Sequence, residues 1–587
     1  MKIKLKVIVL LVCAAFLLTA CTGGGNLIPT TAATTQTAAT TAQAAAATTA
    51  AAAAATEADA AEEGDGVSAY DEFVSFTMNT TADPPGAEDV RWNAYMEKFN
   101  FRVDWIPLQY SERFEKLRIW LATDDLPDIT WIGLNEQVFA EYITWINTGL
   151  FAEIPDLAPY PNIRAMYDRP DMVADILCTF DDKLMTLPAI RGSAAYNYMV
   201  CLGYGYRADW AETLNMRAED DVYSWDEFWN LIEAFITQDP GGNGQGNTYG
   251  ISTRLTYFPD IFGIWQNDPY PWTWEDASYS AIDGQYVWLP ATETFVEGLK
   301  IAKGLYDRGL IWPDNVVDTG ETLYRELYYA GQMGAMGQNN EVGWVSDARN
   351  KTYAADESLT REKTYVVAKV SIPGTENEFY AHSMSCYWSG VAFSKKATDA
   401  QKTRFMETME WNLSEEGKLH AQYGIEGTDY TIASDGTVTL NWEMDSSGTY
   451  VNPHRFSEYY SRLGLDDGAA GLNNVARNPL DVADSRALFE WNMKNIGDKI
   501  KVMDYIQVYT PIASKEVAGT FTTDVRNKMI DLMANSTVDK IEGEWMDWVE
   551  TMLPKVQPVV DELNTLEFIP TEPISMMDFV RGGGIVK

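Results

Sequence analysis

Histidine and cysteine are scarce in this sequence, with three and five copies among 587 residues. The histidines (His382, His420 and His454) and the cysteines do not follow the spacing of zinc ligands. Five cysteines in so long a chain also exclude a scaffold built on disulfides. The sequence contains no nucleophile elbow, phosphate-binding loop or zinc-protease motif. None of the common catalytic signatures is therefore present.

Positive charge is also in short supply. The chain has 44 lysines and arginines against 85 aspartates and glutamates, which gives a formal net charge of -41. Nucleic acids and anionic lipid surfaces repel a protein of this charge, so neither is an expected partner. The charge also disfavours polyanionic ligands, unless a locally basic cleft outweighs the average.

Residues 1–20 have the pattern of a secretory signal peptide. Three early lysines precede an apolar run from Val7 to Leu18, which is too short to span a bilayer of about 30 Å as a helix. Small residues end at Ala20, directly before Cys21, as in a bacterial lipobox. We expect cleavage before Cys21 and a diacylglycerol on its sulfur. An ordinary signal peptide with an incidental cysteine is the alternative.

Residues 21–66 have the composition of a tether. Every residue from Thr31 to Thr56 is Ala, Thr or Gln, so the segment cannot bury enough apolar surface to offset the entropy of ordering it. We expect a flexible, disordered linker that holds the folded part away from the membrane. An alanine-rich helix is the alternative, which the frequent β-branched threonines disfavour.

The remaining residues are too many for one hydrophobic core and suggest two lobes or more. A helix-rich α/β body is predicted, because strand and helix patterns alternate at the start of this region. A capping box formed by Ser224 and Glu227 predicts the start of another helix. The predicted elements are strands at Phe73–Met78, Phe101–Pro107 and Asp128–Ile132, and helices over Trp92–Phe99, Phe114–Leu121 and Phe295–Asp307.

Several short phrases, in a fixed order along the chain, resemble the family 1 extracellular solute-binding proteins of ABC importers, and in particular the large lipoproteins that bind oligosaccharides. The phrases are Leu121–Ile129 (LATDDLPDI), Asp182–Pro188 (DKLMTLP), Tyr206–Trp210 (YRADW), Asp239–Gly250 (DPGGNGQGNTYG), Gly331–Met336 (GQMGAM), Ser414–Gly417 (SEEG) and Tyr423–Gly427 (YGIEG).

This resemblance implies a periplasmic-binding-protein-like fold, in which two lobes meet at a hinge and enclose a ligand cleft. By similarity, residues 67–195 and 378–413 form the N-terminal lobe, and residues 196–377 and 414–587 form the C-terminal lobe. The implied protein is a monomeric, non-enzymatic binder that captures a carbohydrate, expected to be an oligosaccharide, and delivers it to an ABC permease. Its lipid anchor would hold it on the extracytoplasmic face of the cell membrane, as at a Gram-positive surface.

A sugar-binding cleft needs flat aromatic side chains bordered by short polar ones. Trp265, Tyr270, Trp272 and Trp274 lie close together on a segment that prolines interrupt, so they follow no helix or strand period. We expect some of them to line the cleft. Packing beneath a long loop is the alternative.

Two further clusters are candidates for the cleft. Asn339, Asn340, Glu341 and Trp344 combine hydrogen-bonding groups with an indole, although the ordinary polarity of a loop would also explain the amides. Tyr387 and Trp388 precede an apolar strand where, by the resemblance, the chain recrosses the hinge.

A glycine-rich loop resembles the EF-hand-like calcium loop of some members of this family. Asp239, Asn243, Gln245 and Asn247 occupy positions one, five, seven and nine of the loop, but glycines stand at positions three and twelve. Weak Ca²⁺ binding and a plain glycine-rich turn both remain open, and no cofactor is required for the expected function.

Two other functions stay open at this point. A binder of peptides or other organic solutes would favour charged anchors over aromatic platforms. A secreted glycoside hydrolase would also use an aromatic cleft but needs two carboxylates at a working separation, and nothing in the sequence singles out such a pair.

Overall fold

The computed structural model describes residues 70–565, except for 110–111, 134–141, 143–144, 169–177, 181, 191–201, 254–278, 283–284, 319–321, 376–377, 380–386, 446–447, 455–458, 461–473 and 497–521. The expected signal peptide, the lipidation site at Cys21 and the expected tether all lie outside the described residues.

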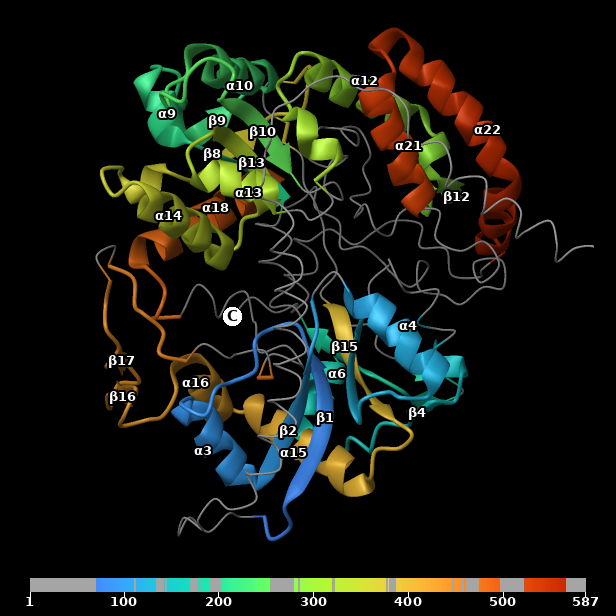
Figure 1. Ribbon diagram of the computed structural model, residues 1–587, viewed down its shortest axis with the longest axis vertical. Coiled ribbons are helices and arrows are strands. Elements are labelled where there is room, and N and C mark those ends of the chain that lie inside the picture. The colour runs from blue at the N-terminus through green and yellow to red at the C-terminus, as the bar shows by residue number, and fades with distance from the viewer. Residues whose placement is uncertain are drawn as a thin grey trace, which may run out of the picture. The chain divides into compact units, whose positions relative to one another are not determined.

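A six-stranded mixed sheet organises the first part of the fold (Figure 1). The strand order is β2-β1-β3-β15-β4, and β7 pairs with β15. Strand β1 runs parallel to β2 and β3, whereas β15 runs antiparallel to β3, β4 and β7. The strands are β1 (Val74–Thr80), β2 (Phe101–Pro107), β3 (Ile129–Gly133), β4 (Phe151–Ala152), β7 (Leu187–Ile190) and β15 (Tyr387–Ser394).

The opening strand and helix pattern is confirmed. Helix α3 (Val90–Phe99) buries Trp92, Tyr95 and Phe99, the face that the sequence spacing predicts. The Asp89 side chain caps the helix by accepting a hydrogen bond from the Trp92 amide at 2.9 Å. Helix α4 (Arg113–Thr123) then connects β2 to β3. This is the parallel β-α-β-α-β order expected of an α/β lobe.

Segments that are distant in sequence complete this first core. Phe405 and Met409 of α15 (Asp399–Asn412) are fully buried in it. Helix α16 (Glu415–Tyr423) lies against α3: the ring of His420 on α16 is 5.9 Å from the ring of Tyr95 on α3. Leu488 of α18 (Pro479–Ile496) also belongs to this core. Helix α16 and part of α18 therefore pack with the first sheet, and the expected lobe boundaries stay a prediction.

A second sheet of five strands has the order β10-β13-β8-β14-β9. Strands β10 and β13 are parallel, as are β14 and β9, while β8 is antiparallel to both β13 and β14. The strands are β8 (Leu202–Tyr206), β9 (Val222–Tyr223), β10 (Tyr249–Thr253), β13 (Met333–Asn339) and β14 (Val366–Val370).

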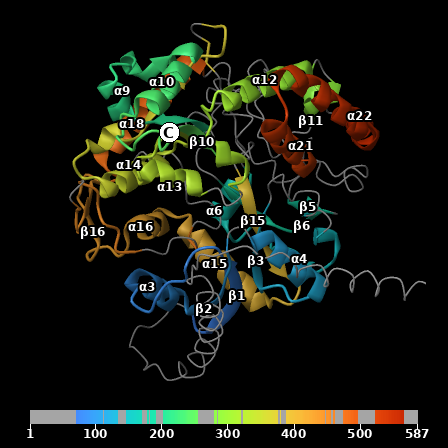
Figure 2. The same ribbon diagram turned by 45° about the horizontal axis from the view of Figure 1, so that its top comes forward.

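Helices cover both faces of this second sheet. Ala368 of β14 packs in the core that contains α10 (Trp225–Gln238), α12 (Glu293–Asp307) and α22 (Val538–Leu563), whereas Val367 packs in the core of α13 (Leu323–Tyr329) and α14 (Val342–Ala355). This alternation follows the period of a strand. Figures 1 and 2 show α21 (Thr522–Asn535) beside α12 and α22. Helix α10 begins with the predicted capping box at Ser224.

The remaining elements are short and connect these layers. They are α6 (Pro161–Tyr167), α9 (Ala208–Thr213), the pairs β5 (Thr179–Phe180) with β6 (Lys183–Leu184), β11 (Tyr279–Ile282) with β12 (Gln285–Trp288) and β16 (Tyr430–Ile432) with β17 (Val438–Leu440), and the 3₁₀ turns η4 (Glu219–Asp221), η6 (Leu289–Ala291), η7 (Pro313–Val316) and η8 (Arg361–Lys363).

No helix within the described ranges combines the length and the hydrophobicity that crossing a bilayer requires. The observed architecture is mixed and helix-rich, with two separate sheets that each have their own buried core. It agrees with the predicted fold class.

Candidate functional site

Most of the aromatic residues predicted for the cleft lie where the structure gives no description. Trp265, Tyr270, Trp272 and Trp274 all fall within residues 254–278. Asn339, at the end of β13, and Tyr387 and Trp388, at the start of β15, are placed by their backbones alone. Ligand binding by these residues therefore stays a prediction.

The other predicted cluster is described, and its members have different surroundings. Asn340 follows β13, is buried, and accepts a hydrogen bond from the Tyr365 hydroxyl at 2.7 Å. Glu341 occupies the N-cap position of α14. The half-buried Trp344 has the Arg325 guanidinium 4.8 Å from its ring centroid, so a cation from α13 faces this indole.

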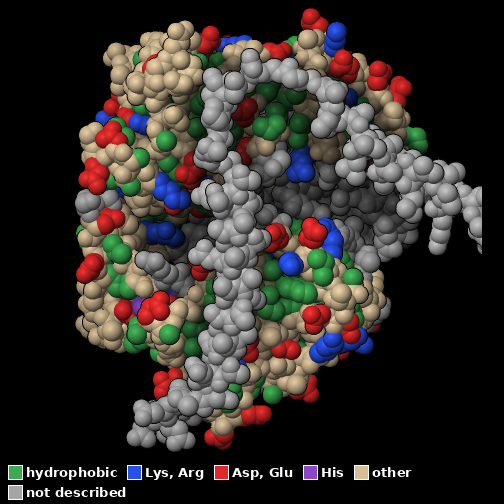
Figure 3. Space-filling model, in the orientation of Figure 1, with side chains coloured by type: hydrophobic (Ala, Val, Ile, Leu, Met, Phe, Trp, Pro, Cys, Tyr) green, Lys and Arg blue, Asp and Glu red, His purple; other side chains and the backbone are tan. Residues whose placement is uncertain are grey.

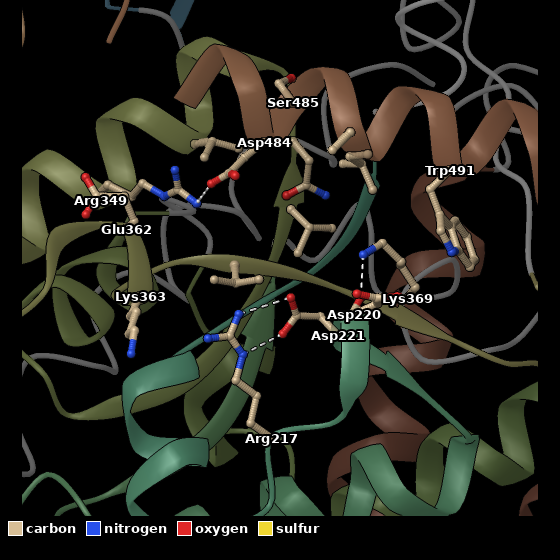
Figure 4. A pocket seen from close by; sticks show the side chains of 16 residues that line it. Arg217, Asp220, Asp221, Arg349, Glu362, Lys363, Lys369, Asp484, Ser485 and Trp491 are labelled. Carbon is tan, nitrogen blue, oxygen red and sulfur yellow. Dashed lines mark hydrogen bonds and ion pairs between the residues drawn. The ribbon is translucent and has the colours of Figure 1, made fainter. Parts of the chain in front are cut away.

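A pocket of about 490 Å³ lies between β14, α18 and the loops around them (Figure 4). This volume is within the range of small-molecule sites. Asn340 is the predicted ligand residue that lines it. The other walls include Arg217 and Asp221 before β9, Val367 and Lys369 of β14, and Asp484, Leu488 and Trp491 of α18.

The α18 wall is fixed by a buried ionic cluster. The Asp481 carboxylate is fully buried and accepts hydrogen bonds from Arg349 at 2.7 Å, from Arg361 at 2.6 and 2.9 Å, and from the Ser346 hydroxyl at 2.5 Å. Burial alone would raise the pKa of Asp481, but the hydrogen bonds from Arg361 and Ser346 and the charge of Arg349 lower it overall. Helix α18 is thereby attached to α14 and η8, next to the pocket.

A second network forms the opposite wall. Arg217 donates to both oxygens of Asp221, at 2.9 and 3.2 Å, and Tyr206 donates to the same carboxylate at 2.5 Å. Burial and the neighbouring carboxylate raise the pKa of Tyr206 far above its usual value, so this hydroxyl stays protonated. Both partners of Asp221 lie within 15 residues of it along the chain, so this wall is a preorganised set of hydrogen-bonding groups.

Trp491 supplies the aromatic surface of the pocket. Its ring makes an edge contact with Phe379 at a centroid distance of 4.7 Å, which fixes its orientation. The Lys369 ammonium lies 5.7 Å from the Trp491 ring centroid and donates to the Asp220 carbonyl at 2.6 Å. Burial lowers the pKa of Lys369. An indole edged by polar groups is the combination that a sugar ring requires.

Sequence reasoning did not find most of this pocket. Arg217, the nearby lysines Lys363 and Lys369, and Trp491 come from three distant parts of the sequence, and no local pattern connects them. Lysine and arginine are scarce in this acidic chain, and that scarcity is only a weak indication that these residues contribute to a binding site. Only the fold brings them together.

The glycine-rich loop does not fit a calcium ion. Both oxygens of its single carboxylate, Asp239, are already engaged, since they accept from the amides of Asn243 and Gly244 at 3.0 and 2.7 Å and from the Thr248 hydroxyl at 2.5 Å. Asn243 turns its amide nitrogen towards the Gly331 carbonyl at 2.8 Å.

Of the two other predicted ligands in this loop, Gln245 is exposed, and the amide nitrogen of Asn247 donates to the Asn243 carbonyl at 3.1 Å. No cluster of potential metal ligands occurs among the described residues. The loop therefore supports the alternative of a self-contained turn, in which a threonine hydroxyl and backbone amides satisfy the carboxylate.

The fold is that of the solute-binding proteins of ABC transporters whose structures have been solved. No family model matches the chain. The ABC-transporter substrate-binding protein FusA of S. pneumoniae, solved as an EF-hand mutant in complex with fructo-nystose, superposes with a TM-score of 0.58 at 16% identity and covers 84% of this chain and 98% of its own.

Two curated proteins from Bacillus subtilis are similar to the chain in sequence. The polygalacturonan/rhamnogalacturonan-binding protein YtcQ of Bacillus subtilis (strain 168) is 24% identical over 374 residues, which are 62% of this chain and 68% of YtcQ. Lipoprotein LipO of the same organism is 22% identical over 392 residues, or 62% of this chain and 70% of LipO. These findings confirm the resemblance that the ordered sequence phrases indicate.

Proposed function

We propose that this protein is the lipid-anchored substrate-binding component of an ABC importer, and that it captures a carbohydrate and delivers it to permease subunits without altering it. The observation that carries the proposal is the pocket between β14 and α18, where Trp491 stands among polar side chains in a chain with the solute-binding fold. A carbohydrate ligand is supported by the similarity to FusA, solved in complex with fructo-nystose, and to YtcQ, named for binding polygalacturonan and rhamnogalacturonan.

The two-lobe arrangement suggests how capture would work. We assign residues 67–195 and 378–413 to one lobe and most of residues 196–377 and the C-terminal part to the other, with α16 and the contact side of α18 added to the first. A ligand that contacts both lobes stabilises the closed form by its differential affinity for that form. The closed, loaded protein is then the form that the permease partners recognise.

The anchor is supported by the sequence and by the similarity to a protein named as a lipoprotein. In cells, the wild-type chain should fractionate with membranes and a Cys21→Ala variant should be released, because the thioether-linked lipid is then missing. Membrane retention of the variant would contradict lipidation at Cys21.

The binding function is tested by titrating the protein with a panel of glycans and peptides while following intrinsic tryptophan fluorescence. We expect saturable quenching by a sugar that is afterwards recovered unchanged. Cleavage products would instead identify a hydrolase, and saturation by peptides alone would identify a peptide binder. Trp272→Ala and Trp388→Ala test the predicted aromatic loops separately, and each should weaken binding by about 1 kcal/mol or more if the indole stacks on the sugar.

A further inference from the structure

The charges that line the pocket cancel one another. Its wall contains four cationic side chains (Arg217, Arg349, Lys363 and Lys369) and four carboxylates (Asp220, Asp221, Glu362 and Asp484). A cleft built to hold a polyanion would show a local excess of cations. This one does not, and it lies in a chain of net charge -41.

The guanidinium groups are already paired with carboxylates, as the dashed lines in Figure 4 show. Arg217 forms a two-point pair with Asp221 and also contacts Glu212 at 2.7 Å. Arg349 donates to Asp484 at 2.7 Å in addition to its bond with buried Asp481. An incoming carboxylate would have to compete with these partners or share their donors, and either costs binding free energy.

The two lysines offer an anion little more. The Lys363 ammonium is 2.6 Å from Glu212. The Lys369 ammonium donates to the Asp220 carbonyl, and the carboxylates of Asp221, Asp220 and Asp484 and the guanidinium of Arg217 act on it electrostatically. A negatively charged ligand that approached Lys369 would therefore meet three carboxylates, and the one neighbouring guanidinium in that set is already paired with Asp221.

An uncharged sugar fits this arrangement better. Each hydroxyl both donates and accepts, so it can donate to a carboxylate and accept from a neighbouring ammonium without separating the ion pairs. Asp484 is 55% exposed in its side chain, and Lys369 is half-buried, so both can be reached from the pocket. Trp491 offers its ring to the apolar face of the sugar.

We infer that the pocket between β14 and α18 selects an uncharged saccharide and discriminates against uronic-acid sugars, the acidic class for which the relative YtcQ is named. The inference rests on the proposed function. It adds to the proposed function the charge of the ligand and the residues that determine this specificity.

The distribution of charge over the surface agrees with this inference. On the face drawn in Figure 3, acidic side chains lie scattered over the described residues with basic ones among them. Long-range attraction of a polyanion to such a surface is not expected, and the overall negative charge slows its approach.

The test compares neutral di- to tetrasaccharides of glucose, galactose, mannose, fructose and xylose with galacturonate oligomers of equal length, by calorimetry on the whole protein. We expect the tightest neutral glycan to bind at least about tenfold more tightly than the galacturonates, with an affinity that changes less than about twofold between low and high salt. Tighter, salt-sensitive binding of galacturonate would overturn the inference and leave the proposed function intact. Binding of no saccharide at all would overturn both.

Variants locate the effect in this pocket. Asp220→Asn removes one negative charge from the wall and should improve galacturonate binding by about three- to tenfold. Glu219→Gln makes the same change at the adjacent residue, which does not line the pocket, and should change it less than about twofold. Equal effects of the two variants would contradict a role for the pocket.

Trp491→Ala should weaken neutral glycan binding at least about tenfold. Trp491→Phe keeps an aromatic ring against Phe379 and should retain most of the affinity, so it separates loss of stacking from loss of structure. Trp344→Ala tests the other described tryptophan of the predicted clusters separately, since that indole does not line this pocket. If Trp344→Ala costs more than Trp491→Ala, the ligand lies elsewhere.

Discussion

The clearest energetic prediction concerns Asp481, the fully buried carboxylate that attaches α18 to α14 and η8. Asp481→Asn keeps the shape of the side chain but removes its charge. Arg349 and Arg361 would then remain buried, with side-chain exposures of 2% and 4%, without their shared counterion. Breaking a buried pair in this way costs about 3–5 kcal/mol. This is a large part of the total stability of a protein, which is about 5–15 kcal/mol.

The assay is urea unfolding followed by circular dichroism, with Asp484→Asn as the matched control. Asp484 contacts the same Arg349, but its side chain is 55% exposed, so the control should cost less than about 1 kcal/mol. A similar midpoint for the two variants would refute the assignment of α18 anchoring to Asp481.

The pH dependence gives a second readout of the same residue. The folded protein lowers the pKa of Asp481, so its contribution is complete above the unfolded pKa of about 3.9 and is lost as the pH falls through the folded value. Asp481→Asn should therefore flatten the acid limb of the stability curve. An unchanged acid limb would contradict this account.

Three further predictions follow from other parts of the fold. Burial lowers the pKa of His420 to about 4, so the histidine of the unfolded state takes up a proton at a higher pH than that of the folded state. The free energy of unfolding should therefore fall by about 2–3 kcal/mol between pH 6.5 and 4. His420→Gln should remove this decrease, as measured by urea unfolding. Addition of Ca²⁺ or of EDTA should leave the thermal midpoint unchanged, because the Asp239 carboxylate is already satisfied, and a rise of several degrees with Ca²⁺ would contradict this. Trp545→Ala should cost about 3–5 kcal/mol in unfolding experiments, because this buried indole stacks on Phe295 and donates to the Pro290 carbonyl at 2.7 Å.

The local elements of this fold could be predicted from the sequence because their signals are local. The strand Phe101–Pro107 has the predicted bounds, and α10 begins where Ser224 and Glu227 form the capping box. Helix α12 ends at Asp307, as predicted, and Gly309 follows with a φ of 70°, which glycine adopts without strain. Periodicity and capping depend on a few neighbouring residues, so no tertiary information was needed.

The pocket depends on contacts that sequence reasoning could not supply. Trp491 of α18 and Lys369 of β14 meet at the pocket, although more than a hundred residues separate them in the sequence. The contact of the Trp344 ring with Arg325, which lies on a different helix, could likewise not be predicted, and ligand binding by Trp344 stays a prediction. The glycine-rich loop had oxygen ligands at calcium-like spacing, but the Thr248 hydroxyl and backbone amides satisfy its carboxylate.

The most direct test of the account is a crystal structure of the protein with the neutral glycan that binds most tightly in the calorimetric panel. We expect a sugar ring against Trp491, with hydroxyls within hydrogen-bonding distance of Lys369 and Asp484. A glycan bound elsewhere, with this pocket empty or filled by side chains, would contradict it.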